Sequence, residues 1–194
     1  MLTTPFIACQ SALINLLLIR AIGVGNFCER NSDSSLQLAV LENMHSALGK
    51  PSCFYQELRC TDAETHYLQS KEINVIQADS LNEVPTQIAD LIKDSSRCFC
   101  LVFMVHFDHL GFERVLKSFE SLNTDHRIIF IGNELPIDYN GELQKKLSNF
   151  KIEPVPLPPK PAQNIGNQQD RSSMWWRKAF ANTCIYVQND NYNS

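Results

Sequence analysis

The sequence predicts an α/β protein, a Rossmann-like, doubly wound and mostly parallel sheet of about five strands with helices on both faces. Two observations carry this prediction. Short runs that are apolar throughout alternate along the chain with longer segments whose apolar residues recur at helical spacing. Strands that are apolar on both sides are typical of a parallel sheet covered by helices on each face, and right-handed crossovers wind such a sheet in two directions.

The elements alternate in order along the chain. The first helix is expected to begin at Ser34, because Ser34 and Gln37 have the spacing of a capping box. An amphipathic segment, GELQKKLSNF, follows the last predicted strand. The expected strands are residues 17–24, 53–58, 73–78, 98–105 and 127–132, and the expected helices are residues 35–48, 61–71, 85–93 and 110–122.

The chain is expected to hold one α/β domain over residues 1–152. A proline- and glutamine-rich linker is expected over residues 153–173, and residues 174–194 are predicted to dock back on the domain as an edge strand. The apolar N-terminus has no basic residue before Arg20 and is interrupted by polar residues, so we expect a short helix there and no signal peptide or membrane span.

Composition narrows the classes of partner. The formal charge is -4 and the 17 Lys and Arg residues are scattered, which argues against a nucleic-acid surface. Seven cysteines form no C-x-x-C pair and several lie in apolar runs, as reduced cysteines of cytosolic or nuclear proteins do.

In an open parallel sheet, ligands bind at the carboxyl ends of the strands, so the residues that follow each predicted strand are the candidates for a binding site. Glycines, asparagines, a carboxylate and a histidine collect there. The candidate ligand-binding residues are Gly23, Gly25 and Asn26 after the first strand, Glu57 after the second, His106 after the fourth, and Gly132 and Asn133 after the fifth.

The glycine turn Gly23-Val24-Gly25 is a poor cradle for a dinucleotide phosphate. The third glycine of the G-x-G-x-x-G pattern is replaced by Cys28, and Glu29 in the loop would repel phosphate. An adenosine ligand without a close phosphate contact, such as S-adenosylmethionine, stays open with Glu57 as a ribose-binding acid. The alternative is that the glycines only allow a tight corner.

Each remaining candidate has a functional and a structural interpretation. Asn26 and Asn133 either face a common ligand or bond their own backbone. His106 is the candidate catalytic base, or a residue whose ring only bonds backbone. No metal site is expected, because C-x-C at Cys98 and Cys100 with H-x-x-H downstream is no established zinc spacing. Haem remains a possible cofactor without a recognisable ligand motif.

Several motifs in order resemble the sensitivity-to-red-light-reduced (SRR-like) family over about residues 18–140: GVGNF, SSLQLAVL, FYQEL, FMVH and IIFIGN followed by Tyr139, with AFANTCIYV near the end. The matching positions include Gly25, Asn26, Gln37, His106, Gly132 and Asn133. The chain departs from the family where Gln56-Glu57 replaces Asp-Pro and where Met104-Val105-His106-Phe107 replaces Met-Pro-His-Cys, and the family's Asn-Trp is absent.

The resemblance implies a regulatory protein of cytoplasm and nucleus, linked to circadian rhythm or to control of haem biosynthesis and without established catalytic activity. Such a protein would act through a protein partner or small ligand. The alternative is a Rossmann-like enzyme that uses S-adenosylmethionine or a nucleotide. A deep pocket at the rim with His106 facing in would favour the enzyme, and a filled rim would favour partner binding.

Overall fold

The computed structural model describes residues 16–28, 33–78, 80–95, 99–122, 126–135, 142–155, 180 and 182–189. The expected N-terminal helix and most of the expected linker lie outside these residues. The strands are β1 (Leu16–Ile22), β2 (Ser52–Glu57), β3 (Ile73–Gln77), β4 (Phe99–Met104), β5 (Arg127–Asn133), β6 (Phe150–Pro154) and β7 (Thr183–Gln188). The helices are α2 (Asp33–Ala47), α3 (Asp62–Ser70), α4 (Thr86–Lys93), α5 (His109–Glu120) and α6 (Glu142–Leu147).

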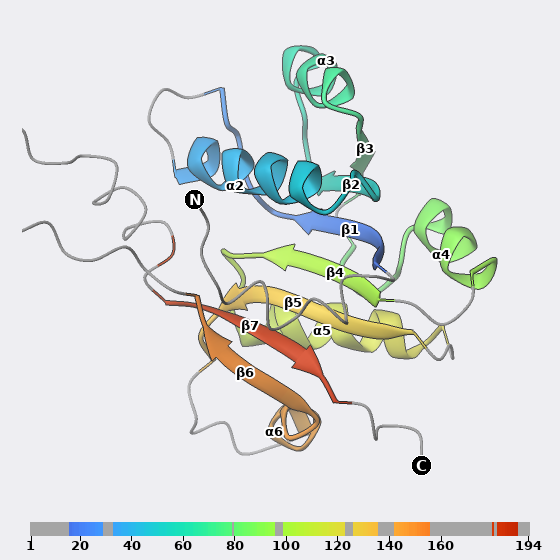
Figure 1. The fold of residues 1–194 in the computed structure, drawn as a ribbon, viewed down its shortest axis with the longest axis vertical. Coiled ribbons are helices and arrows are strands. Elements are labelled where there is room, and N and C mark those ends of the chain that lie inside the picture. Colours follow the sequence, from blue (N-terminus) through green and yellow to red (C-terminus); the bar gives the residue numbers. More distant parts are fainter. Residues whose placement is uncertain are drawn as a thin grey trace, which may run out of the picture.

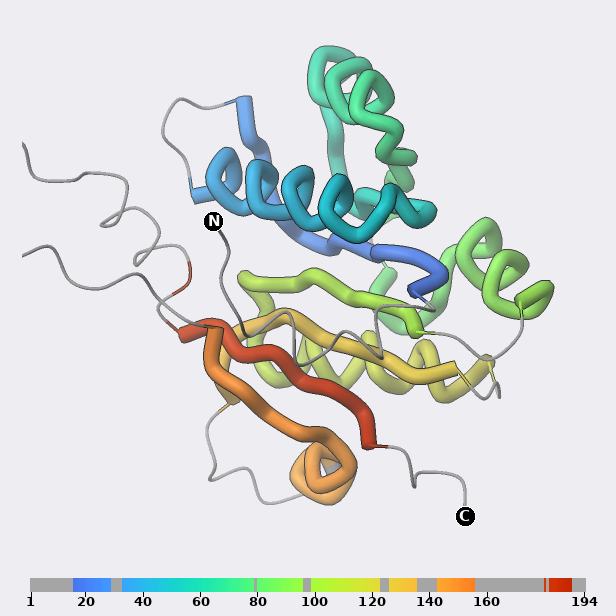
Figure 2. Tube along the Cα trace, in the orientation of Figure 1, coloured from blue at the N-terminus to red at the C-terminus, as the bar shows by residue number. Residues whose placement is uncertain are grey.

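The sheet has seven strands in the order β3-β2-β1-β4-β5-β7-β6, so the expected count of about five was too low. The first five strands pair in parallel, as predicted. The two additional strands are β6 and β7, and β7 runs antiparallel to both of its neighbours. In Figure 2, the red β7 lies between the yellow β5 and the orange β6.

The expected edge position of the C-terminal segment is therefore wrong, because β6 continues the sheet beyond β7. The edge strand β6 carries Lys151, Glu153 and Pro154, and its Ile152 is 46% exposed. Charged residues and proline at a sheet edge discourage pairing with another chain.

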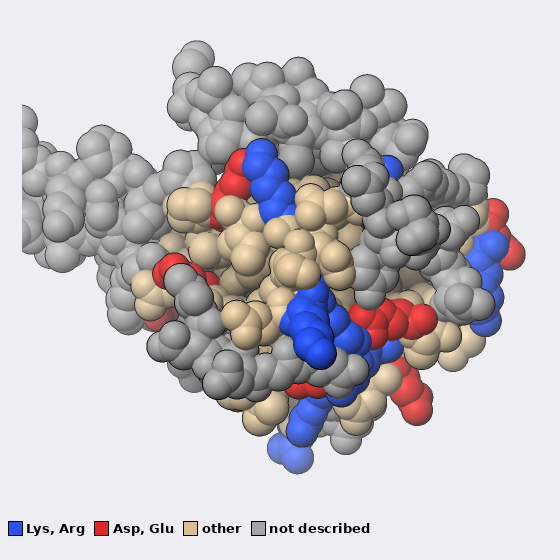
Figure 3. All heavy atoms as spheres, turned by 90° about the horizontal axis from the view of Figure 1, so that it is seen from below, with Lys and Arg blue, Asp and Glu red and all other residues tan. Residues whose placement is uncertain are grey.

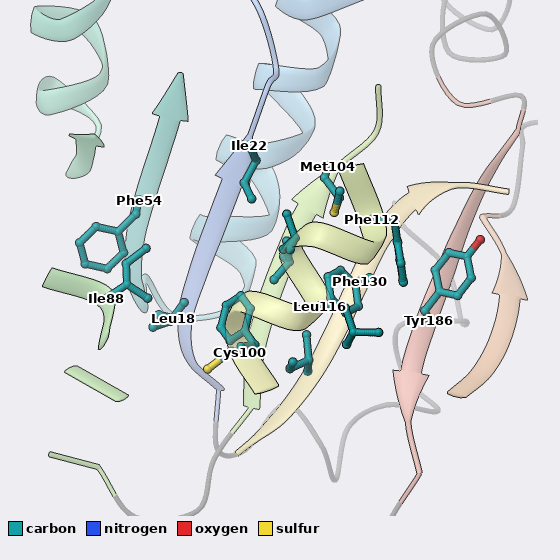
Figure 4. Close-up of a cluster of buried hydrophobic side chains, with 14 of the residues drawn as sticks. Leu18, Ile22, Phe54, Ile88, Cys100, Met104, Phe112, Leu116, Phe130 and Tyr186 are labelled. Carbon is teal, nitrogen blue, oxygen red and sulfur yellow. The ribbon is translucent and has the colours of Figure 1, made fainter. Parts of the chain in front are cut away.

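Helices cover both faces of the sheet, as predicted (Figure 1). Side chains of α2 and α3 pack in one apolar cluster with Ile19, Ala21 and Phe103. Side chains of α4, α5 and α6 pack in the other cluster with alternate residues of the same strands. Figure 4 shows Phe112, Phe130 and Tyr186 close together in this second cluster. Residues of β4 are buried on both faces, which explains its continuous apolar run.

The expected capping box at Ser34 is wrong. Helix α2 includes Asp33 and Ser34, so Ser34 lies inside the first turn and not at the N-cap. The side chain of Gln37 is fully buried and accepts no hydrogen bond from a backbone N–H at the start of the helix. A capping box does form at α3, where Thr61 and Glu64 bond each other's backbone N–H groups. The hydrophobic period located both helices, but only the structure locates their first residues.

Basic and acidic side chains are interspersed on one face of the protein. Figure 3 shows basic and acidic side chains beside one another on the face seen from below. Lys146 pairs with Glu120 and Lys151 pairs with Glu153. Within the residues that the structure describes, no helix is both long and apolar enough to cross a membrane.

The hydroxyl of Tyr186 links β7 to the end of β5 through two hydrogen bonds. It donates to the Asn133 carbonyl at 2.8 Å and accepts from the Leu135 N–H at 3.0 Å, and the side chain is 1% exposed. Burial raises the pKa of Tyr186 to about 12, so the hydroxyl stays protonated as a donor at neutral pH.

Replacing Tyr186 with Phe should lower the free energy of unfolding by about 1–3 kcal/mol, because a buried carbonyl and a buried N–H each lose their partner. Urea unfolding followed by circular dichroism measures this loss. Tyr67→Phe is the control, since Tyr67 is 40% exposed. Equal stability of the Tyr186 variant and the wild type would show that this hydroxyl does not hold β7.

Candidate functional site

The candidate site is the rim at the carboxyl ends of β1, β2, β4 and β5. Strand order reverses between β1 and β4, because β1 leads to β2 on one side while β4 leads to β5 on the other. The helices that follow these two strands, α2 and α5, pack on opposite faces. A crevice between two such loops is where open α/β sheets bind ligands.

The glycine turn after β1 is bonded to β2. Gly23 and Gly25 have φ of +61° and +86°, a region that favours glycine. The Gly25 N–H donates to Glu57 Oε2 at 3.1 Å, and the Tyr55 hydroxyl donates to the Gly25 carbonyl at 2.8 Å. The structure therefore brings two predicted site residues, Gly25 and Glu57, into direct contact.

Both oxygens of the Glu57 carboxylate are bonded within the protein, since Oε1 accepts from the Leu58 N–H at 3.0 Å. The neighbouring Glu64, 3% exposed, accepts from the Phe27 N–H at 3.3 Å and from the Thr61 N–H at 2.9 Å. Burial and the nearby carboxylates raise the pKa of Tyr55, as do the thiols of Cys60 and Cys28. Two carboxylates beside the glycine turn disfavour a phosphate there.

The ring of Phe107 lies between two glycines, one on each side of the rim. A Cβ on Gly23 would lie 2.5 Å from the ring, and a Cβ on Gly111, in the first turn of α5, would lie 2.4 Å from it. Two glycines therefore make room for one aromatic ring at the point where strand order reverses. Phe107 was not among the predicted site residues, although the sequence departs from the family pattern at this position, where Phe107 replaces a cysteine after His106.

The two asparagines bond separate backbone groups. Asn26 is exposed, and its side-chain oxygen accepts from the Cys28 N–H at 2.9 Å. This local bond to the backbone agrees with the structural interpretation of Asn26. Asn133 donates from Nδ2 to the Phe107 carbonyl at 3.1 Å and so holds the loop that carries the ring. Gly132 is buried in β5, where a Cβ would lie 3.4 Å from the Met104 carbonyl.

His106 lies exposed in the turn after β4, and no described residue bonds its ring. Leu110, nearby at the start of α5, is 50% exposed, and Leu58, which follows Glu57, is 58% exposed. The rim thus presents an imidazole and leucine side chains to solvent, while its carboxylate and one of its amides hold the loops together.

Metal ligands do not converge in the described part of the chain: no group of three or more His, Cys, Asp or Glu side chains there is placed to hold a metal ion. The described part of the chain contains the cysteines Cys28, Cys53, Cys60, Cys100 and Cys184, and the thiols of Cys28, Cys53, Cys60 and Cys184 are free. Three of them, Cys53, Cys100 and Cys184, are buried, as the apolar runs around them predicted.

Comparison with known proteins identifies the family. The model of the SRR1 domain matches residues 10–187. The chain belongs to the SRR1 domain family. This confirms the resemblance seen in the sequence motifs, and the SRR1 match extends into β7.

No curated protein matches this SRR1 chain. A chain of the complex between the Haloferax volcanii Trm112 methyltransferase activator and a protein assigned as a methyltransferase is similar over 96% of this chain and 89% of its own, with 10% identity and a TM-score of 0.45. A protein assigned as a Zn-dependent alcohol dehydrogenase from Rhodobacter sphaeroides is similar over 95% of this chain and 72% of its own, with 13% identity and a TM-score of 0.39.

Sequence reasoning also missed a buried polar pair in this SRR1 domain. Arg20 and Gln56 are 0% and 1% exposed, and Gln56 Oε1 accepts from Arg20 Nε at 3.0 Å and from Nη2 at 2.7 Å. Arg20 stands in the middle of an apolar run, so periodicity predicted only a buried strand. The one available signal was a charged residue inside that run.

Gly111→Ala should destabilise the protein by about 1–3 kcal/mol, because the new methyl group would overlap the Phe107 ring. Helix propensity alone predicts the opposite sign, a gain of up to about 1 kcal/mol for alanine in a helix. Chemical denaturation of the variant decides between the two effects.

The same substitution in a Phe107→Ala background is the control. There the ring is absent, and Gly111→Ala should become neutral or stabilising. An unchanged destabilisation in both backgrounds would show that the ring does not occupy the space between the glycines.

Proposed function

We propose that this SRR1-domain chain is a regulatory protein that binds a protein partner at the carboxyl rim of its sheet. The observation that carries this proposal is the position of Phe107. Its ring occupies the space between Gly23 and Gly111, where a doubly wound sheet would otherwise admit a small ligand.

The bonding of the rim supports the same conclusion. Glu57 and Asn133 hold the loops that flank Phe107 and the glycine turn. The groups left at the surface are His106, Leu58 and Leu110. Exposed leucines beside polar groups are the kind of surface that a protein partner buries.

The finer role follows the family resemblance. We propose regulation of circadian rhythm, of haem biosynthesis or of both, in cytoplasm and nucleus and without catalysis. Partner binding is compatible with either role, since it requires no reaction at the rim.

Replacing Leu110 with a photo-crosslinking amino acid in the native cell should join the chain to a defined partner, identified by mass spectrometry. The same photo-crosslinking amino acid at the position of Lys50, which is exposed in the connection between α2 and β2, is the matched control. His106→Ala should weaken the rim crosslink if the imidazole is part of the surface. Identical crosslinks from both positions would contradict a partner site at the rim.

A second candidate is an enzyme that uses S-adenosylmethionine or a nucleotide. The contact between Gly25 and Glu57 favours it, because a glycine turn after β1 and an acid after β2 meet, as a ribose-binding site requires. In this role His106 would stand nearest the chemistry. Haem is the other cofactor to test.

Thermal unfolding with S-adenosylmethionine, NAD(H), ATP and haemin separates the two candidates. Partner binding predicts no shift of the midpoint with any of them. A bound ligand at a hundredfold its dissociation constant would add about 2.7 kcal/mol. Such a gain, lost in both Gly25→Val and His106→Ala variants that still fold, would favour the enzyme, and a Soret band would report haem.

A further inference from the structure

Arg20 is a buried cation on β1, away from the residues assigned to the rim. It faces the same side of the sheet as Leu18 and Ile22, because side chains two apart in a strand share a face. The guanidinium carbon lies 5.6 Å from the centre of the Phe119 ring of α5. The side chain is 0% exposed, and such burial lowers the pKa of Arg20 to about 10.

The hydrogen bonds of Arg20 leave part of the guanidinium unpaired. Nε and Nη2 donate to the neutral carboxamide of Gln56, and Nη2 also donates to the Glu83 carbonyl at 3.2 Å. Nη1 is buried and has no hydrogen-bond partner. In the described part of the chain no carboxylate contacts Arg20, so Gln56 orients the cation without neutralising it.

Arg20 also contacts the segment that leads into α4. Glu83 lies two residues before Pro85, the N-cap residue of α4. The N-terminus of α4 receives no hydrogen bond from a capping side chain. Ile88 of α4 belongs to the cluster of Leu18 and Ile22, and Figure 4 shows it beside Leu18 and Phe54. A helix N-terminus carries a partial positive charge and free N–H groups, which favour an anion.

A buried charge is ordinarily paired, since the low dielectric of a protein interior makes an isolated charge costly. Here, among the residues that the structure describes, a guanidinium bonded to the segment before an uncapped helix has no anionic partner. The Gln56 carboxamide also donates to the Ser80 carbonyl at 3.1 Å, so Gln56 links Arg20 to the segment that precedes α4.

We propose that Arg20 and the N-terminus of α4 bind the oxyanion of a small molecule, a carboxylate or a phosphate, between β1 and residues 80–84. Nη1 donates to one oxygen of the anion, and the first N–H groups of α4 face the other. Binding requires residues 80–84 to move away from the sheet, because Arg20 is fully covered. The site lies on the α4 face and does not depend on the partner surface at the rim.

Nuclear magnetic resonance of the full chain labelled with ¹⁵N-arginine tests the site directly. The Nε–Hε signal of Arg20 is the one that disappears in Arg20→Lys. It should shift saturably when sodium phosphate or sodium acetate replaces sodium chloride at constant ionic strength. Comparison of the two salts tells whether the site prefers phosphate or carboxylate, and the signal of the exposed Arg59 is the internal control.

Thermal unfolding gives a second readout. The preferred anion should raise the midpoint of the wild type by several degrees at saturation, but leave Arg20→Met unchanged. Arg59→Gln, the matched surface variant, should respond as the wild type does. An Arg20 signal that stays in place with both salts, or an equal rise in Arg20→Met, would overturn the proposal. The signal of the wild-type protein decides the question even if Arg20→Met fails to fold.

Discussion

The parallel pairing of β1 with β4 is the constraint on which the rest of the structure depends. It places two buried strands, apolar except for Arg20 of β1, at the centre of the sheet, in register from Leu18 with Cys100 to Ala21 with Phe103. It also reverses the strand order, so that α2 and α5 leave toward opposite faces. The loops after the two strands must therefore diverge, and the space between them has to be filled by a ligand or by the protein itself.

In this chain the protein fills that space with Phe107. The ring needs a residue without a Cβ on each side, and Gly23 and Gly111 meet this need. Asn133 then bonds the Phe107 carbonyl, and Glu57 bonds the glycine turn. Polar residues that resemble a ligand site in the sequence therefore bond the backbone of the rim. They do so because backbone N–H and C=O groups in a sharp turn at the end of a strand still require hydrogen-bond partners.

Buried polar groups elsewhere fall into two kinds. Tyr186 and Glu64 are satisfied by backbone groups of neighbouring segments and tie those segments to the sheet. Arg20 is satisfied only in part, with Nη1 left over. The first kind explains how β7 and α3 are held in place. The second leaves a charge in the interior, and internal hydrogen bonds do not account for it or for the fully buried carboxamide of Gln37.

The sequence by itself determined the elements from β1 to β5, the helices between them and the family, because apolar periodicity and short motifs are local properties. It also located the glycine turn and the polar residues of the rim. Only the tertiary structure decided that β7 lies between β5 and β6, that Asn26 and Asn133 bond separate backbone groups, and that the Phe107 ring lies against Gly23 and Gly111. These outcomes depend on pairing between residues distant in the chain, such as Gly132 with Cys184 or Gly23 with Phe107, and no local pattern encodes the space that two such partners share.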